Sequence, residues 1–394
     1  MKDQYRIGEN KREISSKKDN RPRICLISPY DVSRPVWGSA LRIFELARAL
    51  GDYCEVHLFH SKYTPPEFVS AKRVPLPHQV IWHPAGGSRR YSQVINPGLT
   101  LEAIKESRCS RFSLVICSFP WSGFQGLPVS LLCRCPLVVD EHNVEFLRFA
   151  EIGKGNRFTR WFLKIIEKFF TRRADLVSCV SEADALILNQ EFGIKLEKIL
   201  ILPNGVDTKR LKPNPFSRKK ARKELGITDE ERIILFVGNT KYAPNREAVT
   251  ILSKEIVPRI LAKEENFRIM LIGADNKDVP TWDIFILPGF VERIEDFYNA
   301  SDVVVAPLLS GGGTRYKVIE ALACGKRVIS TKKGAEGLEP SESIIICDEW
   351  DEFAEKIIQN WEIIYDEEAT DYASRYGWDA VVRKLLIALD EMAI

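Results

Sequence analysis

The stretch from Ser310 to Lys317 contains three consecutive glycines and, two residues after the last of them, the first of two cations, Arg315 and Lys317. Glycines let bare backbone N–H groups approach a phosphate, and the helix predicted to begin near Arg315 would add the partial positive charge of its N-terminus. Arg315 and Lys317 fall in the first turn of that helix, where cations oppose the helix dipole. An anion that both side chains share with the backbone removes this opposition, and a pyrophosphate fits. The alternative is a solvated glycine-rich turn without a ligand.

Glu320 lies about one turn further along the same predicted helix. Its carboxylate could accept hydrogen bonds from two ribose hydroxyls of a nucleotide held by Arg315 and Lys317. The alternative is a surface glutamate paired with Lys317, although a lysine that precedes a glutamate has the less favourable order for supporting a helix.

A second polar cluster, Asp140-Glu141-His142-Asn143, follows an apolar run at 136–139. Open α/β sheets bind their ligands at the carboxyl ends of the strands, so these side chains are candidates for ligand contact. The alternative for His142 is an ordinary hydrogen-bonded polar group.

The elements that must position these residues alternate between short apolar runs and amphipathic runs with helical spacing. Apolar runs occur at 23–29, 54–60, 79–83, 113–119, 136–140, 175–180, 199–202, 233–238, 268–273, 284–288, 302–306, 327–330 and 343–347. Amphipathic runs occur at 39–51, 98–107, 155–172, 182–191, 351–363 and 378–392. Such alternation predicts parallel sheets with helices on both faces. We therefore predict an α/β protein with two Rossmann-like, doubly wound domains that face a cleft.

The length of 394 residues is sufficient for two hydrophobic cores. Residues 1–21 are rich in charge and are predicted to form a disordered basic tail. We assign 22–207 to an N-terminal, acceptor-side domain, 208–228 to a basic, proline-bearing linker, and 229–377 to a C-terminal domain that binds the nucleotide. The last helix, within 378–394, is predicted to cross back to the first domain.

Composition narrows the classes of protein further. A net charge of +3 is too small for a global field that gathers nucleic acid, so no nucleic-acid partner is expected. The nine cysteines are scattered in apolar runs, as buried free thiols are in a reducing compartment, and Cys133 and Cys135 lack a second pair at zinc spacing. The first residues lack the apolar core of a signal peptide, and no run of about 18 apolar residues occurs, so a cytoplasmic location is expected.

Motifs in both halves resemble those of the retaining, GT-B-fold glycosyltransferases of family 4, the glycosyl transferases group 1. In the second half the motifs are Phe236–Asn239, Pro244-Asn245, Pro288–Val291, Ser310–Gly325 and Thr331–Leu338. In the first half they are Trp37–Arg42, Asp140–Asn143, Ala174-Asp175, Val180-Ser181 and Asn204–Asp207. The resemblance spans about residues 23–390.

The resemblance implies a role for each matching position. His142, Arg315 and Lys317 would form the catalytic group, with His142 against the transferred sugar and the two cations on the diphosphate. Glu320 would bind the ribose, the backbone around Val291 the base, and Gly38 and Ser39 the region of the phosphates, with Arg42 on the helix behind. The other donor-binding residues would be Asn143, Gly238, Asn239, Lys241, Gly311, Gly312, Gly313 and Thr314.

One position departs from the family pattern. Many members carry a glutamate eight residues before Glu320, where it touches the sugar, and this chain has Gly312 there. Recognition of the sugar would then use the backbone of 311–314. The usual basic residue of the Gly238 loop is not cleanly matched either, and Lys241 is a substitute.

No metal or cofactor is expected for the reaction. The sequence has no Asp-x-Asp pair of the kind that clamps a diphosphate through a divalent ion. Arg315, Lys317 and the helix N-terminus would instead stabilise the leaving diphosphate.

The segment 154–173 sets Trp161, Phe162, Ile165, Ile166, Phe169 and Phe170 on one side of a basic helix. A basic amphipathic helix with aromatic residues can lie on an anionic bilayer, which would put the protein at the inner face of the cell membrane. The alternative is a helix packed on the sheet with a charged outer face.

Together these observations predict an enzyme, a hexosyltransferase that moves a sugar from a nucleotide-sugar donor to an acceptor with retention of anomeric configuration. The acceptor would be a glycan, a lipid-linked molecule or a small molecule, as in polysaccharide biosynthesis at a peripheral membrane site. The alternatives are a nucleotide-sugar epimerase or hydrolase of the same fold, and a non-catalytic partner subunit.

Overall fold

The computed structural model describes residues 21–392 except for 67–68, 70–71, 76, 89–92, 152–155, 281 and 312–314. The predicted tail therefore lies outside the described residues, apart from Arg21. Gly312, Gly313 and Thr314, which were predicted to bind the donor, also lie outside them.

The first domain is built on a sheet of seven parallel strands in the order β3-β2-β1-β4-β5-β6-β7. The strands are β1 (Arg23–Ser28), β2 (Glu55–Ser61), β3 (Val80–Ala85), β4 (Leu114–Ser118), β5 (Leu137–Asp140), β6 (Leu176–Cys179) and β7 (Ile199–Ile201). The helices are α1 (Gly38–Leu50), α2 (Pro97–Cys109), α3 (Gly123–Cys133), α4 (Glu145–Glu151), α5 (Arg157–Arg173) and α6 (Glu182–Phe192).

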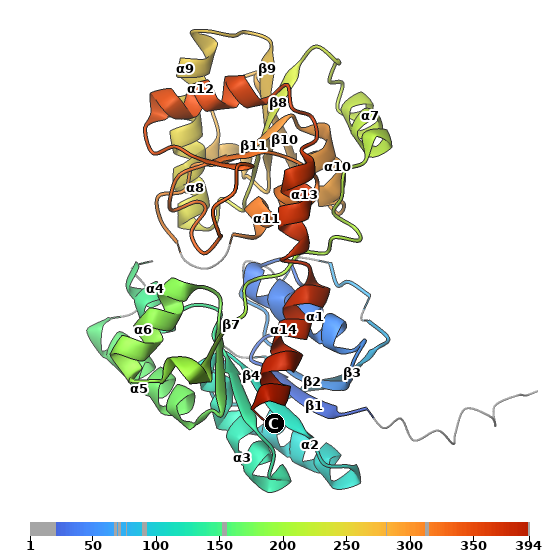
Figure 1. Ribbon diagram of the computed structural model, residues 1–394, viewed down its shortest axis with the longest axis vertical. Coiled ribbons are helices and arrows are strands. Elements are labelled where there is room, and N and C mark those ends of the chain that lie inside the picture. Colours follow the sequence, from blue (N-terminus) through green and yellow to red (C-terminus); the bar gives the residue numbers. More distant parts are fainter. Residues whose placement is uncertain are drawn as a thin grey trace, which may run out of the picture.

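The second domain has six parallel strands in the order β10-β9-β8-β11-β12-β13. They are β8 (Arg232–Val237), β9 (Phe267–Ile272), β10 (Phe285–Gly289), β11 (Val303–Ala306), β12 (Val328–Ser330) and β13 (Ile344–Ile346). The helices are α7 (Pro215–Glu224), α8 (Ala243–Ile251), α9 (Val257–Leu261), α10 (Ile294–Ala300), α11 (Tyr316–Ala323), α12 (Trp350–Asn360) and α13 (Glu367–Ser374). The predicted α/β architecture of two doubly wound sheets is confirmed, with one domain above the other in Figure 1.

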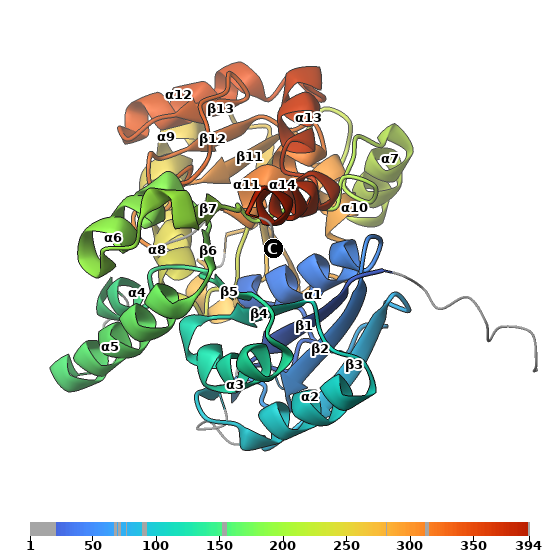
Figure 2. The same cartoon turned by 60° about the horizontal axis from the view of Figure 1, so that its bottom comes forward.

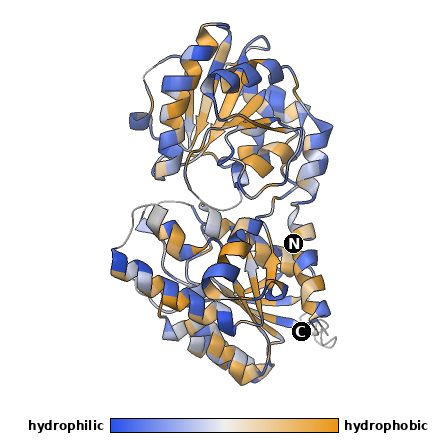
Figure 3. Ribbon diagram, turned by 60° about the vertical axis from the view of Figure 1, so that its left-hand side comes forward, coloured by the Kyte–Doolittle hydropathy of each residue, from blue (hydrophilic) through white to orange (hydrophobic). Residues whose placement is uncertain are grey.

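The apolar runs of the inner strands are buried on both faces, between the helices that Figure 2 shows on either side of each sheet, while the edge strands β3, β7, β10 and β13 are partly exposed. In β8, Ile233 and Leu235 belong to one core, and the alternate residues Ile234 and Phe236 belong to a second core on the other face. Successive side chains of a strand point to opposite faces, so a strand between two helical layers must be apolar at every position. Figure 3 shows this burial as orange strands inside both domains, while blue residues gather on the outer helices.

The C-terminal helix α14 (Trp378–Glu391) packs on the first domain. Trp378, Val382 and Leu385 are buried in the core of that domain, and Figure 1 shows α14 beside α1. The chain passes between the domains before α7 and again before α14, and a parallel bridge pairs Val206 with Gly377 where the two passages meet.

Helix α7 occupies part of the segment 208–228 that was expected to be a linker. Its two arginines are paired with the second domain: Arg218 donates to Asp302 at 2.5 Å, and Arg222 donates to the same carboxylate at 3.3 Å. Asp302 is buried and also accepts the Ile233 backbone N–H at 2.6 Å. The helix therefore belongs to the second domain, which the basic, proline-bearing composition did not reveal.

Replacing Asp302 with alanine is expected to lower the free energy of unfolding of the second domain by about 3–5 kcal/mol, because Arg222 would remain buried without its carboxylate. Chemical denaturation of the full chain measures the effect. The matched control is Asp229→Ala, an exposed acid that should change stability by at most about 0.5 kcal/mol. Equal stability of the two variants would contradict this assignment.

Candidate active site

The first turns of α1 and α11 meet at the boundary between the domains. Tyr316, the first residue of α11, donates to the Asn204 side chain of the first domain at 3.1 Å. A Cβ built on Gly38 would lie 3.5 Å from the Tyr316 ring. Neither helix has a side-chain cap or an acid in its first turn. Two helix N-termini without capping side chains therefore lie close together, and their partial positive charge favours an anion at this boundary.

Lys317 lies on the α11 side of this boundary and is half-buried. Its Nζ donates to Asn245 Oδ1 at 2.8 Å and lies 4.3 Å from the centre of the Phe236 ring. Burial, together with the charge of Arg315, lowers the pKa of Lys317 to about 7. A bound anion would restore the charged form.

The loop after β8 holds Asn245 in place. Asn245 donates to the carbonyl oxygen of Asn239 at 3.0 Å, and the Asn239 side chain accepts the backbone N–H of Lys241 at 2.9 Å. A Cβ on Gly238 would come within 2.6 Å of the Asn245 side chain, so a larger residue there would displace the partner of Lys317. The predicted residues Gly238, Asn239 and Lys317 are thus brought together.

Arg315 is buried and precedes the first turn of α11. Its guanidinium donates to the carbonyl oxygens of Gly311 at 2.7 Å and Lys333 at 3.2 Å, and lies 3.6 Å from the Glu336 carboxylate. Gly311 has a φ of 94°, a conformation that favours glycine. Arg315 therefore joins the loop before α11 to the loop after β12.

Glu320 accepts a hydrogen bond from the buried Tyr298 hydroxyl at 2.9 Å. Burial raises the pKa of Glu320 to about 7, although the bond from Tyr298 opposes this shift. Lys317 donates to Asn245, so the alternative of a Lys317–Glu320 surface pair does not describe this arrangement. Val291 follows β10 and packs partly buried against the same core as Tyr298.

His142 lies at the carboxyl end of β5 and is buried. Its Nε2 lies 3.1 Å from Asp140 Oδ2, and its ring centre lies 4.2 Å from that of Phe119. Burial lowers the pKa of His142, although the Asp140 carboxylate works against this shift. Nδ1 is buried and has no hydrogen-bond partner among the described residues, so a polar ligand atom would satisfy it.

Arg42 is placed differently from the prediction. Its guanidinium donates to both oxygens of Asp140, to Asn204 Oδ1 and to the carbonyl oxygens of Leu202 and Pro203, at 2.7–3.2 Å. Those bonds use all five N–H groups of the guanidinium. A direct contact of Arg42 with the donor would break one of them, so we assign Arg42 to the support of the site. Ser39 lies half-buried in the first turn of α1, ahead of Arg42.

A pocket lies between the two domains, and its wall includes Lys333 and Glu336, two residues that the Arg315 guanidinium contacts. Its wall from the first domain consists of Asn143, Val144, Leu147, Arg148, Ser181, Ala183, Asp184 and Ile187. Its wall from the second domain consists of Lys333, Glu336 and Gly337. Arg148 pairs with Glu145 at 2.7 Å and Lys333 with Glu336 at 2.7 Å, so the pocket presents charged groups of both signs.

Three residues at the site were not predicted: Asn245, Tyr298 and Phe119. Phe119 has a φ of 72° and ψ of 147°, which is strained for a residue with a side chain. Its ring stacks on Trp121 with centres 4.8 Å apart and supports His142. In the sequence, Phe119 lies between a buried strand and Pro120, where the chain must turn, and this position was the available clue to its role.

Solved structures with the same arrangement of domains define the class. Sucrose-phosphate synthase from Thermosynechococcus elongatus superposes with a TM-score of 0.70 at 17% identity, covering 95% of this chain and 99% of that one. HepE from Anabaena, solved with UDP, superposes with a TM-score of 0.70 at 17% identity, covering 94% and 100%. The fold is that of the GT-B class, with two Rossmann-like domains.

Two family models match the sequence, Glycosyltransferase Family 4 over residues 37–210 and Glycosyl transferases group 1 over residues 231–362. D-inositol 3-phosphate glycosyltransferase 2 from Catenulispora acidiphila is 23% identical over 91% of this chain and 92% of its own. D-inositol 3-phosphate glycosyltransferase from Rhodococcus jostii is 24% identical over 52% of this chain. The match spans about half (47%) of that relative's length. The chain belongs to glycosyltransferase family 4 and is a glycosyltransferase.

Replacing Phe119 with alanine is expected to raise the pKa of His142 toward its ordinary value, because one face of the imidazole would open to water. Sugar transfer should slow by about tenfold or more through loss of positioning. The five histidines of the chain are few enough for an NMR titration, with His142→Gln identifying the resonance. An unchanged pKa of His142 in the variant would show that Phe119 does not shield it.

Proposed function

We propose that this glycosyltransferase moves a hexosyl group from a nucleoside diphosphate sugar to a hydroxyl of the acceptor, with retention of anomeric configuration. The observation that carries the proposal is the meeting of two uncapped helix N-termini, α1 and α11, with Lys317 beside them. The neighbours solved with UDP, UDP-glucose and a UDP-fluoroglucose support a diphosphate donor at this boundary.

In this proposal the bond between the anomeric carbon and the diphosphate oxygen breaks while the acceptor oxygen attacks from the same face. The proton of the acceptor hydroxyl passes to an oxygen of the departing phosphate, so the protein need not supply a strong base. Lys317, Arg315 and the N–H groups of α11 stabilise the charge that develops on the diphosphate. We propose that no divalent ion takes part, because these cations would supply the positive charge that the diphosphate requires.

His142 would bind the sugar in its neutral form. Its lowered pKa keeps the ring uncharged at neutral pH, and the buried, unpartnered Nδ1 would accept from a sugar hydroxyl. Glu320, positioned by Tyr298, would accept the ribose hydroxyls. The chain would thus contact the nucleotide from the second domain and the sugar from the first.

We propose that the acceptor enters the pocket between Arg148 and Lys333. The pocket opens between the domains, includes the Lys333 and Glu336 that contact Arg315, and offers donors and acceptors to a hydroxylated molecule. A glycan, a lipid-linked glycan or a small polar molecule fits this chemistry, and polysaccharide biosynthesis is a suitable context.

The test starts with a thermal-shift screen against UDP-, GDP- and ADP-sugars, since a ligand at 100 times its dissociation constant adds about 2.7 kcal/mol of stability. The stabilising donor is then incubated with and without hydroxylated acceptors. Acceptor-dependent transfer that Lys317→Ala and Arg315→Ala abolish is the expected result. Rapid turnover without an acceptor would favour an epimerase or hydrolase, and absence of nucleotide binding would favour a non-catalytic subunit.

Affinity for a nucleotide sugar should fall by about tenfold for each pH unit above 7, because the bound diphosphate requires protonated Lys317, whose pKa in the free protein is about 7. Below the free-state pKa the lysine is already charged and the affinity gains nothing from this group. Calorimetry with UDP-glucose between pH 7 and 8.5 measures the slope.

In the variant Lys317→Arg the affinity for UDP-glucose should not change between pH 7 and 8.5, because a guanidinium stays charged over this range. The matched control is Lys241→Arg, an exposed cation of the same site, which should keep the wild-type slope. A wild-type affinity that is constant over this range would refute the role of Lys317.

We also propose that α5 holds the protein on the cytoplasmic surface of a membrane. Ile166 and Phe170 face the core, but a complete stripe of apolar residues on the same helix is exposed to water: Phe158, Trp161, Phe162, Ile165 and Phe169, with exposed fractions of 44–68%. Arg157, Lys168 and Arg173 flank this stripe in helical position. The alternative, a helix packed on the sheet with a charged outer face, does not account for this exposed apolar stripe.

Two further observations concern this membrane proposal. Phe124 of α3, itself exposed, packs edge-on against Phe170 at 4.8 Å and extends the apolar surface onto a second helix. Among the residues that the structure describes, no helix is both long and apolar enough to cross a bilayer. We therefore propose peripheral contact, in which aromatic side chains insert and cations meet anionic headgroups.

The double variant Trp161→Ser/Phe162→Ser is expected to bind vesicles containing phosphatidylglycerol at least about tenfold more weakly than the wild type, since each buried aromatic side chain contributes about 1.5–3 kcal/mol. Sedimentation with vesicles measures the partition. Phe216→Ser is the control, because Phe216 is 78% exposed on α7 of the other domain. Equal partition of the double variant and the wild type would argue against the contact.

A further inference from the structure

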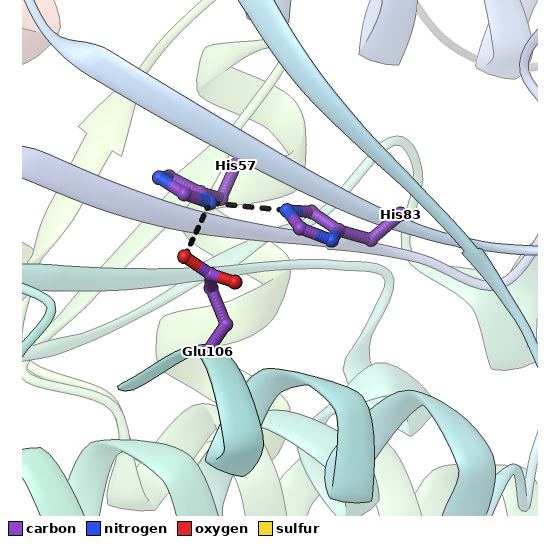
Figure 4. A group of neighbouring side chains, drawn as sticks. All are labelled: His57, His83 and Glu106. Carbon is purple, nitrogen blue, oxygen red and sulfur yellow. Dashed lines mark hydrogen bonds and ion pairs between the residues drawn. The ribbon is translucent and has the colours of Figure 1, made fainter. Parts of the chain in front are cut away.

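Three potential metal ligands lie together in the first domain, on elements far apart in the sequence. They are His57 on β2, His83 on β3 and Glu106 on α2 (Figure 4). One nitrogen or oxygen of each lies within 4.8 Å of the others. His57 is the third residue of its strand, while the active site gathers at the carboxyl ends of the strands, so the cluster belongs to a different part of the domain.

The distances within the cluster suit a transition-metal ion. His57 Nδ1 lies 3.0 Å from His83 Nε2 and 3.7 Å from the nearer oxygen of Glu106. Ligand atoms about 2.0–2.1 Å from a tetrahedral zinc ion are roughly 3.3 Å apart. Small side-chain movements would therefore place all three atoms at bonding distance from one ion, with water at the remaining position.

The surroundings of His57 fit the same interpretation. Glu55 accepts at 2.8 Å from Nε2 when that nitrogen carries the proton, which leaves the lone pair of Nδ1 directed toward His83. A carboxylate behind a histidine ligand is the usual support of a metal site. Arg23 donates to Glu55 at 2.6 Å and to Glu106 at 2.9 Å, which holds both carboxylates beside the histidines.

Arg23 also lies 2.9 Å from His57 Nε2. Without a metal, Nε2 can accept from Arg23, and the Nδ1 proton then bridges the two imidazoles. A divalent ion replaces that proton and selects the tautomer in which Nε2 donates to Glu55. The cluster therefore has one hydrogen-bonded arrangement without a metal ion and another with the ion bound.

We propose that His57, His83 and Glu106 bind a divalent transition-metal ion, with Zn²⁺ as the fitting representative. The ion joins β3, at the edge of the sheet, to β2 and α2, and so stabilises the first domain without taking part in sugar transfer. It is separate from the diphosphate site, for which no metal is proposed.

The test uses the full chain with the substitution Cys109→Ser throughout, because Cys109 is an exposed thiol at the end of α2 and could bind zinc by itself. Competition with a chromophoric chelator measures the stoichiometry and affinity for Zn²⁺. We expect one ion for each chain, and a rise in Tm of about 5 °C or more when free Zn²⁺ is 100 times its dissociation constant.

Glu106→Gln keeps the size of the side chain and should weaken zinc binding at least about tenfold, while the Tm without zinc stays near the wild-type value. His83→Ala should remove the site. The matched control is His78→Ala, which deletes an exposed histidine near the same edge and should leave binding unchanged.

The proposal is overturned if the Cys109→Ser protein binds no zinc, if Glu106→Gln binds as tightly as its parent, or if His78→Ala weakens binding as much as His83→Ala does. Sugar transfer by the chelator-treated protein, assayed well below its Tm, should equal that of the zinc-loaded protein. Loss of transfer on chelation would contradict the proposed separation of the two sites.

Discussion

The buried ion pair between Arg42 and Asp140 connects the parts of the active site. Burial alone would raise the pKa of Asp140, but Arg42 and His142 beside it hold that pKa well below its ordinary range. The carboxylate orients His142, and the guanidinium holds the carbonyl groups of Leu202 and Pro203 at the end of the first domain. If Asp140 were lost, Arg42 would remain buried and charged without a counter-ion, which costs several kcal/mol.

The same arginine extends this arrangement to the second domain. Arg42 donates to Asn204, whose side-chain oxygen also accepts from Tyr316 at the start of α11. A continuous series of polar contacts therefore runs from His142, which contacts the sugar in the proposed mechanism, to the helix that carries Lys317. These contacts connect the two halves of the site.

In the second domain, Lys317 and Glu320 are only partly ionised without a ligand. Lys317 and Glu320 are both half-buried, and burial brings both of their pKa values to about 7. Each group is therefore easily neutralised in the free protein, and each has its charge restored by the partner that the proposed function supplies: a diphosphate for the lysine and ribose hydroxyls for the carboxylate. The desolvation that is unfavourable in the free protein strengthens these contacts once the donor is bound.

Much of the architecture follows from the sequence alone. A strand buried on both faces must be apolar at every position, so the runs of β1 and β8 predicted parallel sheets, and the glycines and cations around α11 predicted an anion site. These features are local, because a strand or a helix N-terminus carries its signature in consecutive residues. The family resemblance added the roles of single positions such as His142 and Glu320.

Only the tertiary structure decided how side chains from distant segments share one place. It gave Arg42 partners that occupy its whole guanidinium, joined α7 to the second domain through Asp302, and turned an aromatic stripe of α5 toward water. It also brought His57, His83 and Glu106 together from separate strands and a helix. None of these contacts has a local signature, because burial and partnership depend on which segments the fold places side by side, and that is a property of the whole chain.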